Sequence, residues 1–268
     1  MNVIVVGSGA REHALCRILH KSYLCEKVFC FPGNYGISQI AECKDISTKE
    51  NIVEECIKIN PDLVVVGPEN YLSENLAGEL RNKGLNVFGP DSDGAKLESS
   101  KEFMKEFCQS HNIPTAKSQT FVDFDEAKNY LESFNGPIVV KYDGLAAGKG
   151  VFVCTNTNEA IEACERIFIK KEFNKENNKV VIEEFIEGKE LSFFTITDGD
   201  EYLNIGSAQD YKRVGNNDTG PNTGGMGTIS PAPILDNNLD MIIQDQIVKK
   251  TIEGLKHDNI AFQGCLLY

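Results

Sequence analysis

The chain has 268 residues, of which 41% are hydrophobic and 25% are charged, and its formal net charge is −13. This length accommodates about two domains with a sizeable core. The acidic balance argues against a nucleic-acid-binding surface, which requires a basic stripe. It also means that a phosphate ligand must be held by local lysines, arginines and backbone N–H groups rather than by the overall field.

The nine cysteines are scattered along the chain without a Cys-x-x-Cys pair. We interpret them as reduced, mostly buried thiols of a cytosolic protein rather than as a disulfide set or a zinc site. The first residues, MNVIVVG, have no basic region and too short an apolar run for a signal peptide, and no stretch approaches membrane-spanning length. We therefore expect a cytoplasmic protein whose partners include neither nucleic acid nor membrane.

The N-terminal stretch predicts a strand, a turn and a helix. Residues 3–6 are apolar and mostly β-branched, Gly7 and Gly9 follow them, and residues 14–19 have helical spacing. Two glycines at a helix N-terminus form a turn that binds anions. The turn therefore predicts a phosphate site, and a dinucleotide is one candidate ligand.

The dinucleotide fingerprint is incomplete, which weighs against an NAD site. Its third position holds Glu12, where close packing of the helix favours glycine or alanine. The second strand, residues 27–31, is followed by Pro-Gly-Asn rather than by a ribose-binding acid. A smaller phosphate ligand with Arg11 and His13 as donors remains open, as does a purely local role for His13 at the helix N-terminus.

Strands and helices continue to alternate up to about residue 100. We expect strands at residues 62–66 and 85–88, a helix capped by Ser47 or Thr48 and ending at Ile59, and a helix over residues 73–83. Repeated βα units with apolar strands predict an α/β domain with a doubly wound parallel sheet, whose ligands bind at the carboxyl ends of the strands. Residues 67–69 lie at such an end and are binding candidates, although we favour a plain turn there. A domain boundary is placed near residue 100.

The second part of the chain predicts helices mixed with hairpins. The expected helices follow Ser100, follow a cap at Asp123 or Asp125, and cover residues 158–168 and 239–255. Strands at residues 191–197 and 202–207 are joined by Asp-Gly-Asp, a strong hairpin signal. Residues 209–227 are polar and rich in glycine, so we predict a long functional loop there rather than a linker. The last seven residues resemble a core strand.

A glycine-rich loop lies between two apolar runs. Residues 138–140 predict a strand that ends at Lys141, and Gly144, Gly148 and Gly150 follow before a second run at residues 151–153. Glycines let the backbone approach an anion closely, and Lys149 adds a positive charge to that of Lys141. A hydroxyl residue does not follow Lys149, so this is not a Walker loop. The pattern predicts a phosphate loop at a hairpin tip, and a plain surface hairpin is the alternative.

Five blocks together resemble a known family. They are residues 7–13, 66–69, 141–151, 181–186 and 209–227, the last including the specific run GPNTGGMG. The chain is identified by them as a member of the phosphoribosylamine-glycine ligase family (glycinamide ribonucleotide synthetases), which are ATP-grasp enzymes of purine biosynthesis. The resemblance implies that glycine is joined to 5-phosphoribosylamine through a glycyl phosphate, with ATP converted to ADP and phosphate. It also implies a Rossmann-like domain over residues 1–100 and an ATP-grasp domain over residues 101–268, with a small lid subdomain at about residues 115–188.

The resemblance assigns site residues position by position. It implies that Lys101 and Lys141 bind the ATP phosphates, which replaces an interpretation of Lys101 as a solvated helix charge. The other implied nucleotide residues are the lid Ala147, Gly148, Lys149 and Gly150, the adenine hinge Glu183, Glu184, Phe185 and Ile186, and the ribose acid Glu190. The implied substrate residues are Gly7, Gly9, Arg11, His13, Asp210, Lys212, Arg213, Asn222 and Gly224. Of these, Arg213, Lys141 and Asp210 are expected to act in catalysis, since an arginine beside an acyl phosphate stabilises developing charge.

Two features depart from the family pattern. Tyr142 follows Lys141, where a small residue is usual. The chain also ends before the family's acidic metal-binding strand, so the ligands for Mg²⁺ or Mn²⁺ are expected beyond Tyr268, and the ATP-grasp domain is expected to be incomplete. We therefore expect weak ATP binding with little metal dependence. The alternatives are a non-catalytic ATP-binding remnant or a subunit completed by a second chain, and a nicotinamide-dependent oxidoreductase.

Overall fold

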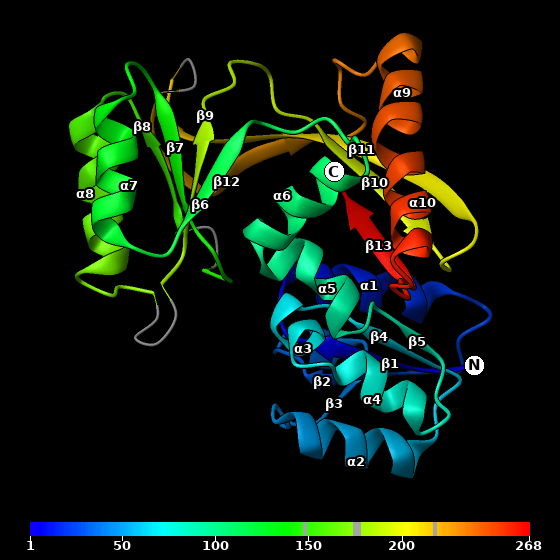
Figure 1. Cartoon of the computed structure of the whole chain (residues 1–268). Coiled ribbons are helices and arrows are strands. Elements are labelled where there is room, and N and C mark those ends of the chain that lie inside the picture. The colour runs from blue at the N-terminus through cyan, green and yellow to red at the C-terminus, as the bar shows by residue number, and fades with distance from the viewer. Residues whose placement is uncertain (147–148, 174–177, 217–218) are drawn as a thin grey trace. The chain divides into compact units, whose positions relative to one another are not determined.

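The computed structural model describes residues 1–146, 149–173, 178–216 and 219–268, and the side chains of these residues except Pro221 and Asn222. The N-terminal strands form a five-stranded parallel sheet in the order β3-β2-β1-β4-β5 (Figure 1). The strands are β1 (Asn2–Gly7), β2 (Lys27–Pro32), β3 (Glu42–Cys43), β4 (Leu63–Val66) and β5 (Val87–Phe88). The predicted parallel sheet is confirmed.

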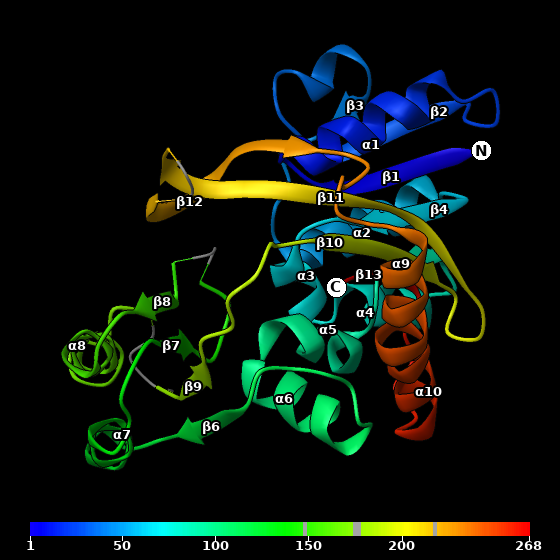
Figure 2. The same cartoon turned by 90° about the horizontal axis from the view of Figure 1, so that it is seen from above.

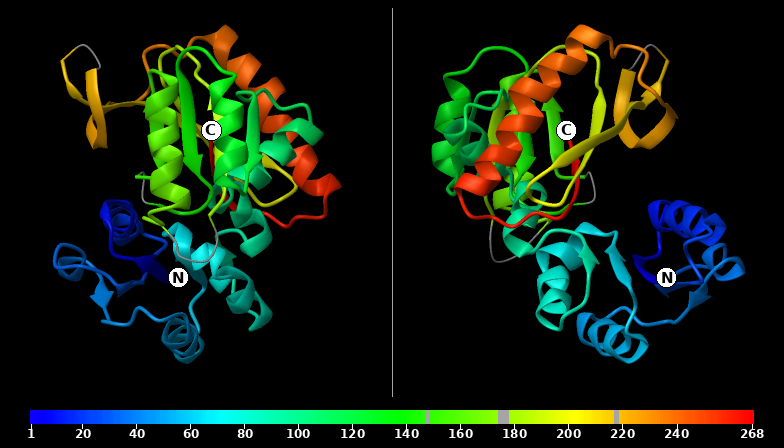
Figure 3. Two further views of the ribbon diagram at one scale, coloured as in Figure 1. Left: turned by 60° about the vertical axis from the view of Figure 1, so that its left-hand side comes forward. Right: turned by 90° about the vertical axis from the view of Figure 1, so that its right-hand side faces the viewer.

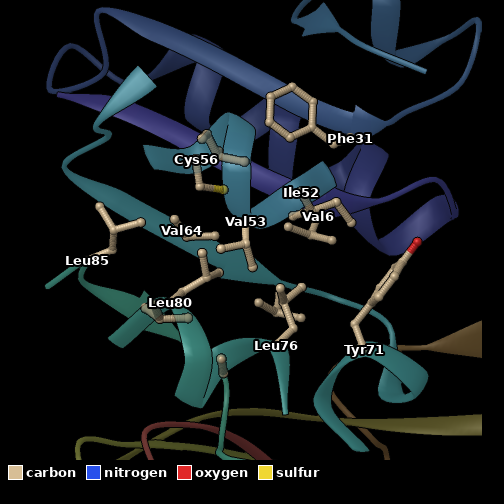
Figure 4. Packing of buried hydrophobic residues seen from close by; sticks show 14 of the residues in the cluster. Val6, Phe31, Ile52, Val53, Cys56, Val64, Tyr71, Leu76, Leu80 and Leu85 are labelled. Atoms are coloured by element: carbon tan, nitrogen blue, oxygen red, sulfur yellow. The ribbon is translucent and has the colours of Figure 1, made fainter. Parts of the chain in front are cut away.

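Helices cover both faces of this sheet because both faces of its strands are apolar. They are α1 (Ala10–Lys21), a 3₁₀ turn (Ile37–Gln39), α2 (Lys49–Ile59), α3 (Glu69–Ser73), α4 (Leu76–Asn82) and α5 (Ser92–Ser99). Ile4 and Val6 belong to a core cluster with residues of α2 and α4 (Figure 4), whereas Val5 belongs to a cluster with Cys16 of α1. Alternation along β1 therefore sends successive side chains to opposite helical layers, as in a doubly wound fold.

The helix predicted over residues 73–83 is wrong in extent. The structure has two short helices, α3 and α4, separated at Asn75, whose φ of 64° lies in the left-handed region. Asparagine tolerates this conformation better than most residues, so it can break a helix without a glycine or a proline. The helix ending at Ile59 is confirmed, and Thr48 caps it by accepting a hydrogen bond from Asn51 N at 3.4 Å.

The described residues cluster into two compact units, which we describe separately. The first contains residues 1–95 together with residues 196–202 and 255–265. The second contains residues 96–195, 203–254 and 266–268. The boundary near residue 100 stays a prediction, since the first unit also includes two segments from later in the sequence.

The second unit contains a four-stranded sheet with the order β6-β9-β7-β8. Its strands are β6 (Ser118–Phe121), β7 (Ile138–Tyr142), β8 (Val151–Cys154) and β9 (Val180–Glu184), all paired antiparallel. Helices α7 (Phe124–Glu132) and α8 (Thr157–Phe168) lie side by side on one face (Figure 2). Their apolar residues share a buried cluster with Ile138, Val140 and Tyr142, so Lys141 and its neighbours of alternate parity lie on the opposite face.

Another four-stranded sheet has the order β12-β11-β10-β13. Its strands are β10 (Ser192–Thr197), β11 (Tyr202–Gly215), β12 (Thr219–Ile229) and β13 (Gly264–Leu267). The predicted turn between β10 and β11 is confirmed, with Gly199 at a φ of 101°. The long loop predicted over residues 209–227 is wrong: most of it forms the antiparallel pair of β11 and β12. Backbone hydrogen bonds across this pair hold a strand conformation that its glycines and polar residues do not favour by themselves.

Four further helical segments complete the fold. Helix α6 (Lys101–Ser110) begins at a Ser100 cap, and α9 (Asn237–Ile243) runs through a π-helical segment (Gln244–Val248) into α10 (Lys249–His257). The last three form one continuous rod, coloured orange to red in Figure 3, which extends the helix predicted over residues 239–255 at both ends. Among the described residues, the helices are too short or too polar to span a bilayer.

Candidate functional site

The glycine-rich stretch lies at the tip of the β7–β8 hairpin, as predicted. Lys141 pairs with Val151 across the hairpin, and Tyr142 N donates to Gly150 O at 2.8 Å. Gly144 has a φ of 154°, and a Cβ there would come within 2.7 Å of the Tyr142 ring. Only glycine therefore fits this turn beside the tyrosine. Ala147 and Gly148 lie outside the described residues.

Tyr142 is part of the packing of this hairpin. It is buried, and its ring stacks on Phe173 with 5.1 Å between centroids. The side chain faces the helical layer with Val140 rather than the face that carries Lys141. The tyrosine is therefore accommodated in the core, on the side of the sheet opposite Lys141.

Asp143 joins the start of the glycine loop to the N-terminus of α6. Its Oδ1 accepts hydrogen bonds from Lys101 N at 2.6 Å and Glu102 N at 3.1 Å, and Ser100 Oγ donates to it at 3.2 Å. A carboxylate at a helix N-terminus satisfies otherwise unpaired N–H groups and interacts favourably with the helix dipole. This cap holds the helix that carries Lys101 against the loop that begins after Lys141.

Lys101 points toward the base of the same loop. Its Nζ donates to Gly144 O at 2.9 Å. Burial lowers the pKa of its ammonium group, while the nearby charges of Glu98 and Asp143 oppose that change. An ammonium group that has lost solvation and has few strong acceptors gains free energy when an anion arrives, which is what a phosphate ligand requires.

A buried carboxylate lies beneath these lysines. Glu183 is 5% exposed, and its Oε2 lies 2.9 Å from Lys141 Nζ and 3.3 Å from Lys105 Nζ. Its Oε1 is buried and has no hydrogen-bond partner among the described residues. Burial lowers the pKa of Lys105, an effect that Glu183 opposes. The arrangement carries two positive charges against one negative charge.

Glu184, the last residue of β9, is held by hydrogen bonds, whereas the two residues that follow it are exposed. Glu184 N donates to Lys117 O at 3.0 Å, and its side chain accepts from Lys117 N at 2.8 Å. Phe185 and Ile186 follow the strand with side chains that are 37% and 64% exposed. The side chain of Glu183 thus belongs to the lysine cluster, while Phe185 and Ile186 are exposed to solvent.

The β11–β12 hairpin carries the other predicted residues of this unit. Lys212 forms an ion pair with Glu190, and Asp210 lies opposite Thr228, whose Oγ1 is 3.5 Å from Asp210 Oδ1. Arg213 pairs in register with Asn222, whose side chain is not described. Gly224 lies in the same strand, β12.

Arg213 also borders a pocket of about 550 Å³ in the second unit. Phe185 and the strand β8, from Val151 onward, line the same pocket. Residues of α8 from Glu159 to Arg166 also line the pocket, and its lining includes neither Lys101 nor Lys141. The pocket thus brings Phe185 and Arg213 together beside β8 and α8, apart from the lysine cluster.

The turn predicted in the first unit has a different internal arrangement from a dinucleotide loop. Glu12 is 2% exposed, and its Oε2 accepts the Gly9 N–H at 2.6 Å. A Cβ on Gly67 would lie 2.1 Å from Glu12 Oε1, so the carboxylate fills the space between the two turns. A carboxylate in this place uses a donor and repels a pyrophosphate, which supports the argument against NAD.

Arg11 and His13 lie around this turn. Arg11 Nη1 forms an ion pair of 2.8 Å with Glu69 Oε1, and this hydrogen bond lowers the pKa of Glu69. His13 packs against Gly36, where a Cβ would come within 2.6 Å of its ring. The segment of residues 67–69 thus contributes more than a turn, because Glu69 begins α3 and holds Arg11.

Sequence reasoning missed Asp143 and Lys105. Both carried a usable signal: Asp143 stands two residues after Lys141, and Lys105 follows Lys101 by four, the spacing that places two side chains on one helix face. The nine cysteines are all thiols and six of them are buried, which confirms the interpretation of scattered core cysteines.

A parallel-sheet unit, followed by two antiparallel sheets with lysines at a glycine-rich hairpin, defines an ATP-grasp protein with its preceding α/β domain. A family model described as "Phosphoribosylglycinamide synthetase, N domain" matches residues 1–98. A second, described as "Phosphoribosylglycinamide synthetase, ATP-grasp (A) domain", matches residues 99–268. The chain belongs to the phosphoribosylglycinamide synthetase family.

Curated relatives and a solved structure agree with this placement. The chloroplastic phosphoribosylamine-glycine ligase of Arabidopsis thaliana is 47% identical over 261 residues, covering 96% of this chain and 49% of the relative. The phosphoribosylamine-glycine ligase of Brucella melitensis is 44% identical over 268 residues, covering 99% of this chain and 62% of the relative. The crystal structure of the Thermotoga maritima phosphoribosylamine-glycine ligase matches with a TM-score of 0.84 and 31% identity, over 100% of this chain and 64% of that one. The chain therefore spans between half and two thirds of the length of these relatives.

Proposed function

We propose that this chain binds ATP and takes part in the ligation of glycine to 5-phosphoribosylamine. The observation that carries the proposal is the lysine cluster at the base of the glycine hairpin, where Lys101 and Lys141 lie beside the loop and Glu183. The names of the relatives, phosphoribosylamine-glycine ligases, support the choice of reaction.

The triphosphate is assigned to Lys101, Lys141 and the loop that includes Ala147, Gly148, Lys149 and Gly150. Phosphoryl transfer depends on positioning and charge stabilisation more than on covalent chemistry by the protein. Each charge-assisted hydrogen bond to a phosphate contributes about 1.5–3 kcal/mol. Closure of the loop over the phosphates would keep water from an acyl phosphate.

The base and sugar of ATP are assigned to the segment after β9. Backbone groups of Glu183, Glu184, Phe185 and Ile186 would read the adenine edge, and Glu190 would accept hydrogen bonds from the ribose hydroxyls. The exposed position of Phe185 supports this assignment. Lys212, the present partner of Glu190, would remain close to the nucleotide.

The proposed ligation proceeds in two steps. A carboxylate oxygen of glycine attacks the γ-phosphorus of ATP and ADP leaves, which forms glycyl phosphate. The amine of 5-phosphoribosylamine then attacks the acyl carbon, phosphate leaves, and the nitrogen loses a proton. We assign Arg213 to the charge that develops on the phosphate and acyl oxygens, and Asp210 to the amino groups of the substrates.

The remaining substrate residues are assigned in each unit separately. Lys212, Asn222 and Gly224 are assigned to the substrates in the second unit. In the first unit, Gly7, Gly9, Arg11 and His13 are assigned to the sugar phosphate, with Arg11 exchanging Glu69 for the ligand. The Gly9 N–H already donates to Glu12, so this assignment leaves Arg11 and His13 as the main donors.

The described residues of the lysine cluster fit a triphosphate and do not fit a divalent cation. Glu183 is already neutralised by two lysines, and Asp143 is held at the N-terminus of α6. Mg²⁺ prefers oxygen ligands that keep their negative charge. No step is therefore assigned here to a metal ion.

Calorimetry with ATP tests the nucleotide site. Lys141→Met is expected to weaken ATP binding about 10- to 100-fold, because one charge-assisted phosphate contact is lost. Lys128→Met is the matched control, since Lys128 is an exposed lysine of α7 paired only loosely with Glu132 at 3.9 Å. Equal ATP affinity in wild type and Lys141→Met, or no binding by the wild type, would contradict the proposal. Release of phosphate that requires both glycine and 5-phosphoribosylamine would then test the ligase reaction.

A further inference from the structure

Lys105 differs from the other two lysines of the cluster in how its donors are used. Its Nζ donates to Thr115 Oγ1 at 2.8 Å and Ala116 O at 2.9 Å, and lies 3.3 Å from Glu183 Oε2. An ammonium group has three N–H donors, so these acceptors occupy all of them. The side chain is only 8% exposed. Lys105 is therefore committed to protein acceptors and is not arranged to bind a ligand.

Lys141 shares the carboxylate of Glu183 but has room to leave it. A quarter of its side chain is exposed, and it lies at the end of β7 beside the glycine loop. A phosphate that recruits Lys141 must draw it from Glu183 Oε2, at 2.9 Å. A buried carboxylate without any partner is strongly unfavourable, because it has lost its hydration and gained no counter-charge. Some other cation must therefore stay with Glu183 when Lys141 moves.

We propose that Lys105 is a positioning residue that remains paired with Glu183 and so releases Lys141 to the nucleotide phosphates. The proposal rests on the proposed ATP site and concerns a residue outside its ligand set. With Lys105 in place, Lys105, Lys141 and Glu183 together have a net charge of +1, which attracts a triphosphate. Without it, Glu183 and Lys141 form a neutral buried pair, and the carboxylate holds the lysine.

The test compares ATP with adenosine, which lacks phosphates, in calorimetric titrations of the whole chain. Lys105→Met is expected to weaken ATP binding about tenfold or more and to leave adenosine binding unchanged. The double variant Lys105→Met/Glu183→Gln is expected to recover most of the lost ATP affinity, because a neutral amide no longer holds Lys141. A merely structural role for Lys105 would weaken both ligands and would not be rescued.

Several controls make the outcome decisive. Lys128→Met, an exposed lysine substitution on α7, is expected to bind both ligands like the wild type. If Lys105→Met does not fold by circular dichroism, Lys105→Gln replaces it, since the glutamine keeps a donor toward Thr115 and Ala116 but not the charge, and the same loss of ATP affinity is expected. Unchanged ATP affinity in the Lys105 variant that folds, or a double variant that is not rescued, would overturn the role of Lys105. Those outcomes leave wild-type ATP binding intact, whereas a wild type that binds no ATP overturns both the site and this role.

Discussion

At Lys101, burial and a bound phosphate act on the ammonium pKa in opposite directions. Burial lowers this pKa from its ordinary value of 10.5. A phosphate placed beside the group would raise it again by stabilising the charged form. Free protein therefore binds fewer protons than the complex in the alkaline range between the two pKa values. The lowered pKa also means that the folded state binds fewer protons than the unfolded state between the pKa of Lys101 in the folded protein and 10.5. The contribution of Lys101 to the free energy of unfolding therefore rises with pH through that range.

We predict that the proton uptake on ATP binding grows as the pH rises toward the ordinary lysine pKa of 10.5, because the terminal phosphate, with a pKa of about 6, is already ionised and Lys101 is the group that gains charge. Calorimetry in two buffers with different ionisation enthalpies measures the uptake. Lys101→Met should reduce it strongly, and Lys128→Met should leave it unchanged. An uptake of zero in the wild type, or equal uptake in Lys101→Met, would contradict this role for Lys101.

Glu12 shows how one residue decides between two ligand classes. From the sequence it is a mismatch to a dinucleotide fingerprint. In the structure its carboxylate accepts the Gly9 N–H and lies against Gly67, in the space where a pyrophosphate would need backbone donors. Glu12 is therefore part of the structure of the turn, because its carboxylate occupies the place that a bound pyrophosphate would take.

Among the elements, helix α7 has its N-terminus defined by a single side chain. Asp123 Oδ1 accepts a hydrogen bond from Glu126 N at 3.0 Å, while Asp125 lies inside the first turn of the helix. The two aspartates were open alternatives in the sequence, because either can precede the apolar pattern. The structure selects Asp123 because its extended backbone turns the carboxylate toward the free N–H groups.

Asp123→Ala should therefore destabilise α7 by about 1 kcal/mol, the usual cost of losing an N-cap. Hydrogen exchange of the α7 amides is the measurement, and an increase of about fivefold in exchange rate corresponds to that free energy. Asp125→Ala is the matched control, because it removes only a favourable interaction with the helix dipole, about 0.3–1 kcal/mol at most. A larger effect from Asp125→Ala than from Asp123→Ala would refute the assigned cap.

At the scale of the whole molecule, the first unit depends on residues that come late in the chain. Phe262 is 5% exposed and packs against Gly94, where a Cβ would lie 2.9 Å from its ring. Gly89 N donates to Gln263 O at 2.8 Å, just beyond the end of β5. The first unit is thus held just beyond β5 by a segment more than 160 residues later in sequence.

Phe262→Ala should destabilise the first unit by about 3–5 kcal/mol, because a large buried ring is replaced by a cavity. Hydrogen exchange should quicken in β5 and α5, although both precede the substitution by a long stretch of chain. Phe134→Ala, at a phenylalanine that is 36% exposed, is the control and should leave these amides unchanged. Protection of β5 and α5 that is the same in both variants would show that the late segment does not support the first unit.

The sequence by itself predicted the parallel sheet and the glycine hairpin, because hydrophobic periodicity and glycine placement are local properties of the chain, whereas only the family resemblance assigned Lys101 to phosphate. Tertiary structure alone decided that most of the described residues between 209 and 227 form the strands β11 and β12, since their cross-strand hydrogen bonds outweigh weak local propensity. It also decided that Lys105, Lys141 and Glu183 share one buried charge cluster. Such a cluster depends on distances between residues up to 78 positions apart, and these distances exist only once the strands and α6 have packed.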